Sequence, residues 1–500
     1  MKRRYKVLIS TLVLLAAIPS FLLLSGSVNV NSLRMILNVA AGHGIDAPSE
    51  ERLQNTLTVP KGFTVERFAS DLRNARFMLF TEQGDLLVSR PHVGDVQLLQ
   101  RDRSRPLNAR PEIDQRSTLL SDLSRPHGIA LHEGWLYIAE DVQISRVRFN
   151  SESASLEGEL QVIVGDLGGD GNHWTKNIGI GPDQKLYLSQ GSTCNVCVEE
   201  DERRATMMRY DLDGRNETLV ATGLRNSVGF DWAPWDQALY ATDNGRDMLG
   251  DDFPPCELNR IELGGFYGWP YYNADNIPDP DMGTPPANIS GNPVAPAHGF
   301  RAHNAPLGMR FLQNDQWPTA FDRTALVALH GSWNRSSLDG YKVVSLHWTE
   351  SGIEERDFLV GFERDGDVIG RPVDVVQGPD GAIYVSDDYS GSVYRVSYGE
   401  AGRDLVVADE VSADLPAEAP VWASGEGVAE KRAAGQALFE QNNCRSCHLP
   451  GSGKMALEQL EERLSFADVE RVLTEPRPPM PRFSLSETER QALAIYLLGR

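Results

Sequence analysis

The chain has 500 residues, of which 41% are apolar and 24% are charged, so it can bury a sizeable core and is long enough for two or three domains. Its formal net charge of -22 argues against an anionic partner such as nucleic acid or an anionic membrane surface. The charge fits a neutral small-molecule ligand, whereas an anionic ligand would need a local basic pocket.

The N-terminus has the three parts of an export signal. Four basic residues within the first six are followed by an apolar run from Val7 to Leu24 and by the small residues Ser25-Gly26-Ser27. This pattern predicts a signal peptide over residues 1–27, although the run is also about long enough to remain as a membrane anchor. We therefore expect a periplasmic protein, either soluble or anchored to the inner membrane by this segment.

Residues 74–398 contain six copies of a strand, a polar turn and a second strand. The second strands are Asp85–Val88, Trp135–Ile138, Lys185–Leu188, Ala238–Ala241, Ala325–Ala328 and Ala382–Val385. Strand-rich copies that recur about every 50 residues predict an all-β six-bladed β-propeller over residues 58–398. A β-sandwich would not need a repeated unit. Phe63–Arg67 is an additional strand that we expect to pair into the last blade and close the ring.

Three cysteines lie within this predicted propeller. Cys194-Asn195-Val196-Cys197 is followed by Val198 and not by histidine, so it is not a haem attachment site. In an oxidising compartment the spacing favours a short-loop disulfide. A metal site, or pairing of one of the two with Cys256, are the alternatives. Because three is an odd number, we expect one free thiol.

Two segments lack the strand pattern. Residues 268–305 are rich in Pro, Asn and Asp, which predicts a long ordered loop over one face of the propeller. Residues 399–426 are rich in Ala, Glu, Asp and Pro and have no apolar period, which predicts an interdomain linker.

Residues 427–500 are predicted to form a small all-α cytochrome c domain. Cys444-Arg445-Ser446-Cys447-His448 has the attachment pattern of a covalent c-type haem, with His448 as an axial iron ligand. We expect Met480 to be the second axial ligand, because Met455 lies too close to His448 in sequence. A disulfide or half a zinc site are alternatives, but no second Cys or His pair follows at zinc-ligand spacing.

Two helices are expected to flank this haem. Glu430–Phe439 has the pattern of a helix that leads into the motif, and Ser486–Leu498 that of a closing helix. Ser484 or Ser486 is suited to cap the second helix, with Glu487 and Glu489 near its positive end.

Polar residues recur where each predicted blade should open onto one mouth of the central channel. The start of the first strand and the end of the second strand of each blade lie on the same face of a propeller. The residues that precede first strands are Arg76, His127, His173 to Asn177, Arg225-Asn226, His303-Asn304 and Arg371. The residues that follow second strands are Arg90, Glu140, Gln190, Asp243-Asn244, His330 and Asp387. Several arginines suit a flat ligand with several carboxylates. A histidine suits a general base near neutral pH, with His127 as a rival to His173. The loop Asn244–Asp252 offers oxygen atoms to Ca²⁺, without the full EF-hand spacing.

Residues 60–398 resemble the soluble PQQ-dependent sugar dehydrogenases (glucose, sorbosone and pyranose dehydrogenases). The resemblance is carried in the right order by six stretches: His173–Tyr187, Gly223–Phe230, Asn244–Asp247, Gly264–Pro270, Gly331–Arg335 and Gly370–Val375. It implies a six-bladed propeller that binds PQQ and Ca²⁺. The C-terminal part is similar to the small cytochromes c that are fused to such propellers.

The resemblance also implies roles for particular residues. His173 matches the catalytic histidine, Arg225 and Asn226 match the quinone-binding pair, and Arg371 matches an arginine that holds a quinone carboxylate. Gly245 and Arg246 match family positions whose backbone carbonyls bind Ca²⁺.

Three positions depart from the glucose-oxidising members. Asn334 and Arg335 stand where those members have a quinone-contacting lysine, and Arg335 is expected to substitute for it. Ser192 replaces a sugar-contacting acid, and Val228 replaces a glutamine. These changes favour the sorbosone or pyranose branch over glucose.

Together these patterns predict an exported quinohaemoprotein. A sugar would be oxidised at the propeller, and electrons would pass to haem c and on to a respiratory acceptor such as a cytochrome or terminal oxidase. A Ca²⁺-dependent lactonase on the same propeller would not explain the haem motif. A non-catalytic binding propeller that carries an electron-transfer cytochrome would tolerate loss of His173.

Overall fold

The computed structural model describes residues 38, 44–283, 285–286, 293–313, 317–399, 428–441, 457, 469, 472–473 and 485–498. The chain divides into two compact units, Met1–Ala408 and Asp409–Arg500. No helix in these described ranges is long and apolar enough to span a membrane. The predicted export signal lies outside them.

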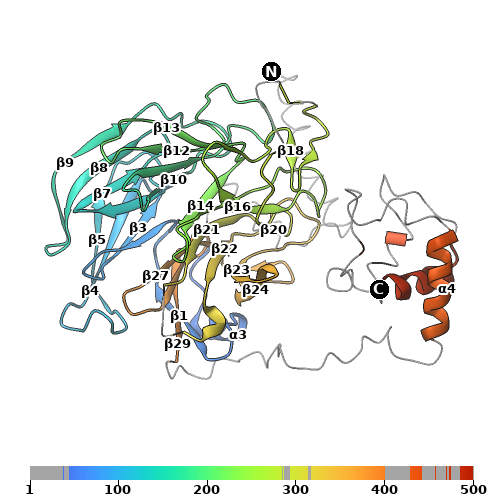
Figure 1. The fold of residues 1–500 in the computed structure, drawn as a ribbon. Coiled ribbons are helices and arrows are strands. Elements are labelled where there is room, and N and C mark those ends of the chain that lie inside the picture. The colour runs from blue at the N-terminus through green and yellow to red at the C-terminus, as the bar shows by residue number, and fades with distance from the viewer. Residues whose placement is uncertain are drawn as a thin grey trace, which may run out of the picture. The chain divides into compact units, whose positions relative to one another are not determined.

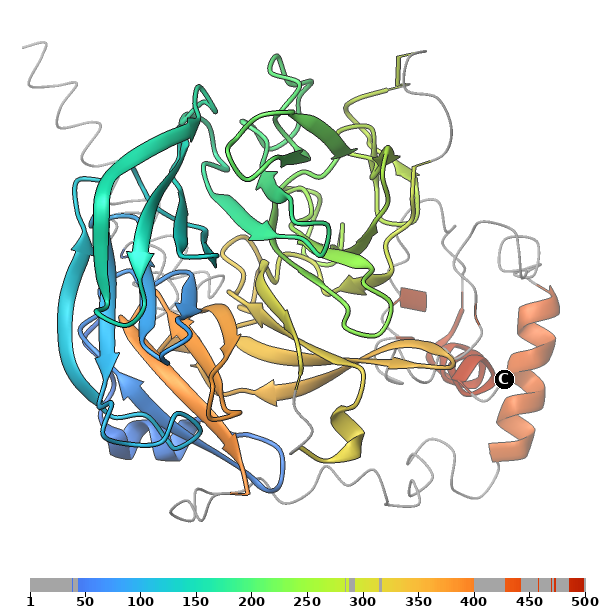
Figure 2. The same cartoon turned by 60° about the vertical axis from the view of Figure 1, so that its left-hand side comes forward.

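The first unit is a six-bladed β-propeller, as the repeat predicted (Figures 1 and 2). Blade 1 consists of β2 (Met78–Phe80), β3 (Leu86–Arg90), β4 (Asp95–Arg101) and β5 (Ile113–Leu120). Blade 2 consists of β6 (Ile129–His132), β7 (Trp135–Ala139), β8 (Ile144–Asn150) and β9 (Ser155–Val164). Blade 3 consists of β10 (Lys176–Ile180), β11 (Leu186–Gln190), β12 (Thr206–Tyr210) and β13 (Thr218–Thr222). Blade 3 also carries β17 (Gly265–Phe266), which runs parallel to β13.

Blades 4 to 6 continue in chain order around the ring (Figure 2). Blade 4 consists of β14 (Ser227–Trp232), β15 (Leu239–Asp243), β16 (Cys256–Ile261) and β20 (His298–Phe300). Blade 5 consists of β21 (Pro306–Phe311), β22 (Thr324–Leu329), β23 (Lys342–Thr349) and β24 (Gly352–Leu359). Blade 6 consists of β27 (Pro372–Gln377), β28 (Ile383–Asp387), β29 (Ser392–Tyr398) and β1 (Phe63–Ala69). All six predicted second strands are therefore confirmed. A short hairpin, β25 (Glu363–Arg364) with β26 (Asp367–Val368), precedes blade 6.

The first strand of each blade is the innermost one. Strands β2, β6, β10, β14, β21 and β27 contact one another in that order and back to β2. Phe77, Val228, Leu307 and Val373 pack together as a buried apolar cluster. This cluster places Val228 against hydrophobic side chains, so it has no polar role of the kind that a glutamine could perform there.

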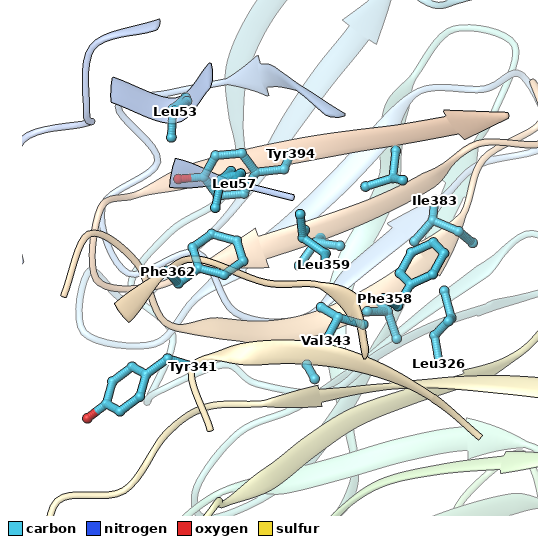
Figure 3. Packing of buried hydrophobic residues seen from close by; sticks show 14 of the residues in the cluster. Leu53, Leu57, Leu326, Tyr341, Val343, Phe358, Leu359, Phe362, Ile383 and Tyr394 are labelled. Carbon is cyan, nitrogen blue, oxygen red and sulfur yellow. The ribbon is translucent and has the colours of Figure 1, made fainter. Parts of the chain in front are cut away.

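The ring is closed by its N-terminal strand, which confirms the expectation for Phe63–Arg67. Strand β1 pairs antiparallel with β29, from Phe63 opposite Tyr398 to Ala69 opposite Val393. Before it, helix α3 (Glu50–Thr56) begins at Ser49, whose hydroxyl accepts the Arg52 N–H at 3.2 Å. The helix side chain Leu53 packs into the largest apolar cluster, with residues of blades 5 and 6 (Figure 3).

The expectation of one long loop over residues 268–305 was wrong in part. It contains the hairpin of β18 (Tyr272–Asn273) and β19 (Ile277–Pro278), and strand β20, which pairs with β16 as the outer strand of blade 4. Strand β20 has three residues with Gly299 at its centre. It is too short to show the alternation from which strands are recognised in sequence.

The second unit contains helix α4 (Val428–Gln441) and helix α6 (Glu487–Leu498), which confirms both predicted helices. They cross closely at Gly435, where an added Cβ would lie 2.0 Å from the Ala492 carbonyl oxygen. Ser486 caps α6 and Glu489 accepts from the Ser486 N–H in return, a capping box. Cys444, Cys447, His448, Met480 and linker residues 400–426 lie outside the described residues.

Candidate active site

A disulfide-closed segment contacts several of the residues that were predicted to lie at the mouth of the central channel. Cys194 and Cys197 form a disulfide, while Cys256 is free and buried, so both cysteine expectations are confirmed. We call residues 191–199 the bridged loop. It follows β11, the second strand of blade 3, and its neighbours are the predicted catalytic and quinone-binding residues.

His173 lies in the segment that enters β10 and contacts the bridged loop directly. Its ring Nδ1 is 2.8 Å from the Ser192 hydroxyl oxygen, and its backbone N–H donates to the Ser192 carbonyl at 3.3 Å. Burial lowers the pKa of His173 to about 3, and the positive charge of Arg225 adds to this shift. The imidazole is therefore neutral at physiological pH, the state that a general base requires.

Arg225 and Asn226 lie just before β14, on the same side as His173. Arg225 is buried and its guanidinium donates to oxygen atoms of Asn195, Asn244, Gly245 and Asp247 at 2.8–3.1 Å. A Cβ placed on Gly191 would lie 2.6 Å from both the Asn226 Oδ1 and the His173 Cβ. Glycine at this position thus lets His173 and Asn226 approach each other.

The two residues predicted to bind Ca²⁺ have other contacts here. The Gly245 carbonyl accepts from Arg225 Nη1 at 2.9 Å, and the Arg246 side chain pairs with Asp279 and Asp281. Asn244 and Gly245 offer the hard carbonyl oxygens that Ca²⁺ prefers. Each of these two carbonyls accepts a hydrogen bond from Arg225 Nη1 and keeps a second lone pair that a cation could use.

The remaining two predicted quinone ligands differ in their surroundings. Arg335 donates to the carbonyls of Asp251 and Ala302 and pairs with Asp252, so its charge braces the loop that follows β15. Arg371 is buried and donates to the carbonyls of His330 and Gly331 at 3.2 and 3.4 Å. Within the described residues it forms no ion pair with a carboxylate.

A second network joins blades 1, 2, 5 and 6. Asp388 accepts from Arg76 Nη1 at 2.7 Å and from His330 Nε2 at 2.9 Å. Burial alone would raise the pKa of Asp388, but His330, Arg76 and Arg371 together lower it. The Arg76 guanidinium also donates to His127 Nε2 at 3.3 Å, and this occupies the lone pair that His127 would need as a base.

Sequence reasoning missed Asp388 and named its neighbour Asp387. Asp387 instead accepts backbone N–H groups of Arg371, Tyr389 and Ser390, so it shapes the turn after β28. Successive side chains of an extended chain point to opposite sides. The pair Asp387-Asp388 indicated a carboxylate at this place, but the sequence did not show which of the two contacts Arg76 and His330.

The site face holds buried polar atoms without hydrogen-bond partners, an arrangement that fits a polar ligand. Within the described part of the chain they include Asn226 Oδ1, Asn244 Oδ1, Asn334 Oδ1 and both side-chain polar atoms of Asn304. Buried polar groups are normally paired, and an amide offers either an acceptor or donors. The amide oxygens can accept from N–H or O–H groups of a ligand or coordinate a cation, whereas Asn304 Nδ2 and Arg371 can donate to carbonyl and carboxylate oxygens such as those of PQQ.

Comparisons with known proteins cover both units. Residues 57–255 and 287–399 match the family described as TrAA12-like. Residues 430–497 match the family of cbb3-type cytochrome c oxidase subunit III.

Similar proteins support the match over the propeller. An uncharacterised protein of Borreliella burgdorferi is 30% identical over 70% of this chain and 92% of its own length. A PQQ-dependent pyranose dehydrogenase of Coprinopsis cinerea is 35% identical over 70% of this chain and 56% of its length. The solved structure of a Trichoderma reesei protein of carbohydrate-active enzyme family AA12 covers 69% of this chain and 98% of its own at 21% identity, with a TM-score of 0.60, and so supports the fold. The chain therefore belongs to the TrAA12-like family of PQQ-dependent sugar dehydrogenase-type propellers, here followed by a C-terminal cytochrome c domain.

Proposed function

We propose that this protein is an exported quinohaemoprotein that oxidises an aldose or a related sugar of the sorbosone or pyranose type. The observation that carries the proposal is the buried Arg371 guanidinium, which has carbonyl partners but no ion pair among the described carboxylates. A buried cation is stabilised by an anionic partner, and a PQQ carboxylate would be one. Arg225 and Asn226 would hold the same cofactor beside His173.

His173 supplies the base for the substrate hydroxyl. Ser192 contacts its Nδ1, which leaves Nε2 to accept the hydroxyl proton. Its lowered pKa keeps it neutral at physiological pH. PQQ, when bound, supplies the acceptor for the hydride that leaves the substrate carbon.

The C-terminal domain provides the outlet for the electrons. Cys444, Cys447, His448 and Met480 would hold a covalent haem c, which takes electrons one at a time and delivers them to a respiratory acceptor. Fusion of the two domains makes this transfer intramolecular and raises the effective concentration of the acceptor haem. An exported chain fits both the covalent haem and the N-terminal pattern of residues 1–27.

Two positions favour a substrate other than glucose. Val228 is buried in an apolar cluster, and Ser192 is occupied by His173 and by the Cys194 carbonyl. Neither can make the sugar contacts that a glutamine and an acid would make. The similarity to a pyranose dehydrogenase supports a pyranose-type substrate.

The test is reduction of the haem by sugar in the purified full-length protein. The protein is loaded with PQQ and Ca²⁺, mixed with a panel of aldoses, and the absorption band of reduced haem is followed. Sugar-dependent reduction that is lost in His173→Ala, with an unchanged oxidised haem spectrum, is the expected result. Absence of haem reduction by every sugar, with PQQ shown to be bound, would overturn the proposal. Unchanged turnover in His173→Ala would assign the base to another residue.

A further inference from the structure

The bridged loop contacts predicted site residues at the entrances to two different blades. Its Ser192 holds His173, which enters blade 3, and its Asn195 holds Arg225, which enters blade 4. The Ser192 N–H also donates to the Arg225 carbonyl at 2.8 Å. One short segment therefore sets the positions of both the predicted base and a predicted quinone ligand.

The contact with His173 determines which ring nitrogen carries the proton. The Ser192 hydroxyl donates to the Cys194 carbonyl at 2.7 Å, and a carbonyl can only accept. The Ser192 oxygen is then left to accept from His173 Nδ1–H at 2.8 Å. This chain of hydrogen bonds favours the tautomer whose Nε2 is the free base, and it ends on a cysteine of the disulfide.

The contact with Arg225 uses the residue between the two cysteines. The Asn195 carbonyl accepts from Arg225 Nε at 2.9 Å, and its side-chain oxygen accepts from Arg225 Nη2 at 2.8 Å. The same Asn195 side chain bonds the backbone N–H and carbonyl of Asp247 at 2.8 and 3.1 Å. The Asn195 carbonyl also accepts from the Trp269 indole at 3.2 Å. Asn195 thus joins Arg225 to the loop after β15.

The disulfide closes the stretch of backbone that presents these groups. The Cys194 carbonyl and the whole of Asn195 lie between the two bridged sulfurs. Opening the bond returns conformational freedom to these residues. A separate brace remains, because Glu199 accepts from the Thr193 N–H at 2.7 Å and from its hydroxyl at 2.9 Å. Loss of the disulfide should therefore loosen the loop locally and leave the blade folded.

We propose that the Cys194–Cys197 disulfide is a positioning element of the active site, so that full activity requires this bond to be closed. The inference rests on the proposed function. Both cysteines are partly exposed and Val198 beside them is 64% exposed, so a small dithiol can reach the bond. Such a dithiol supplies two electrons and two protons, leaves Cys194 and Cys197 as thiols, and is itself oxidised to a disulfide.

The test uses the full-length protein and two measurements. Variants are the double change Cys194→Ala/Cys197→Ala, the single changes Ser192→Ala and Ser192→Thr, and Val198→Ala as a matched control on the same loop. The first measurement, on protein without PQQ, is the ¹⁵N signal of histidine-labelled chain, with His173 identified by its loss in His173→Gln. The second is kcat and KM for sugar in PQQ-loaded protein.

The expected result separates positioning from simple stabilisation. In Ser192→Ala and in the double cysteine variant, His173 should become a mixture of tautomers and kcat should fall about five- to tenfold, the effect of one lost buried hydrogen bond. KM for sugar should change less than twofold in Ser192→Ala, Ser192→Thr should restore kcat, and Val198→Ala should match the parent protein.

Three outcomes decide the inference. A double cysteine variant that keeps the parent tautomer and kcat, whether or not its melting temperature falls, would overturn it. Failure of Ser192→Thr to restore kcat would overturn the role of the Ser192 hydroxyl. A tautomer change in a protein that oxidises no sugar would refute the proposed function and support the positioning of His173.

Discussion

The dependence of sugar oxidation on pH tests the electrostatics of the site directly. An unperturbed histidine has a pKa of about 6.5 and would be protonated, and so inactive as a base, in mild acid. Burial and the positive charge of Arg225 lower the pKa of His173 to about 3. We therefore expect the rate of haem reduction by sugar to change less than about twofold between pH 8 and pH 5.

The magnitude follows from the neutral fraction of the imidazole. With the ordinary pKa, about 3% of the base would be neutral at pH 5, and the rate would fall about thirtyfold. With a pKa of about 3, about 99% remains neutral at pH 5. The two cases differ by more than tenfold, which is well beyond the scatter of a rapid-mixing experiment.

The assay is stopped-flow mixing of PQQ-loaded protein with saturating sugar, with the reduced-haem band as signal. Dithionite reduction at each pH serves as control for the haem domain, and His173→Ala gives the background rate. A fall of tenfold or more between pH 7 and pH 5 that is absent from the dithionite control would refute the reasoning. It would mean that His173 is more hydrated, or less exposed to the charge of Arg225, than its contacts indicate.

Three further changes test the fold, a buried carboxyl and the haem. Phe63→Ala should lower the free energy of unfolding by about 3–5 kcal/mol, measured by denaturant titration. The side chain is 5% exposed, and its ring centroid lies 4.7 Å from that of Trp317, where blade 6 packs against blade 5. A loss below about 1 kcal/mol would contradict this prediction. Burial raises the pKa of Asp374 to about 7, above its unfolded value, so its contribution to stability is present at low pH and is lost as pH rises through 7. Asp374→Asn should therefore remove about 2 kcal/mol of the decline in stability between pH 5 and pH 7. Equal dependence of the melting temperature on pH in both proteins would count against this pKa. Met480→His should keep covalent haem and lower its reduction potential, and an unchanged potential by redox titration would assign the axial ligand elsewhere.

The repeat was predictable because each blade is a local unit. Its second strand is a short apolar run after a turn such as Gly181–Gln184, and both signals lie within a few residues. The closing strand was predictable because it stands outside the six copies and would leave an unpaired edge. The disulfide was predictable because two cysteines stand at a short spacing in a chain that we expect to be exported.

The contacts between blades could not be predicted in the same way. Arg76 and Asp388 are 312 residues apart, and no local pattern relates them. From the sequence, Ser192 was interpreted only as the replacement of an acidic residue. In the structure its hydroxyl oxygen contacts His173 Nδ1, and no local pattern indicated this contact. Such roles depend on which loops the ring brings together, and this is set by the closure of all six blades.

The negative charge of the chain limits which ligand the site can hold. A net charge of -22 disfavours an anionic cofactor unless the site retains positive charge of its own. Asp388 neutralises Arg76, Asp279 neutralises Arg246, and Asp252 pairs with Arg335. Arg225 shares its charge with Asp247, whereas Arg371 forms no ion pair with a carboxylate of the described residues, so we expect its guanidinium to bind a ligand carboxylate. Arg371→Lys keeps that charge but not the planar fork, and we expect it to bind PQQ more weakly than the parent protein but more tightly than Arg371→Met. Equal PQQ affinity of Arg371→Met and the parent, by calorimetric titration, would show that the cofactor carboxylates are held elsewhere.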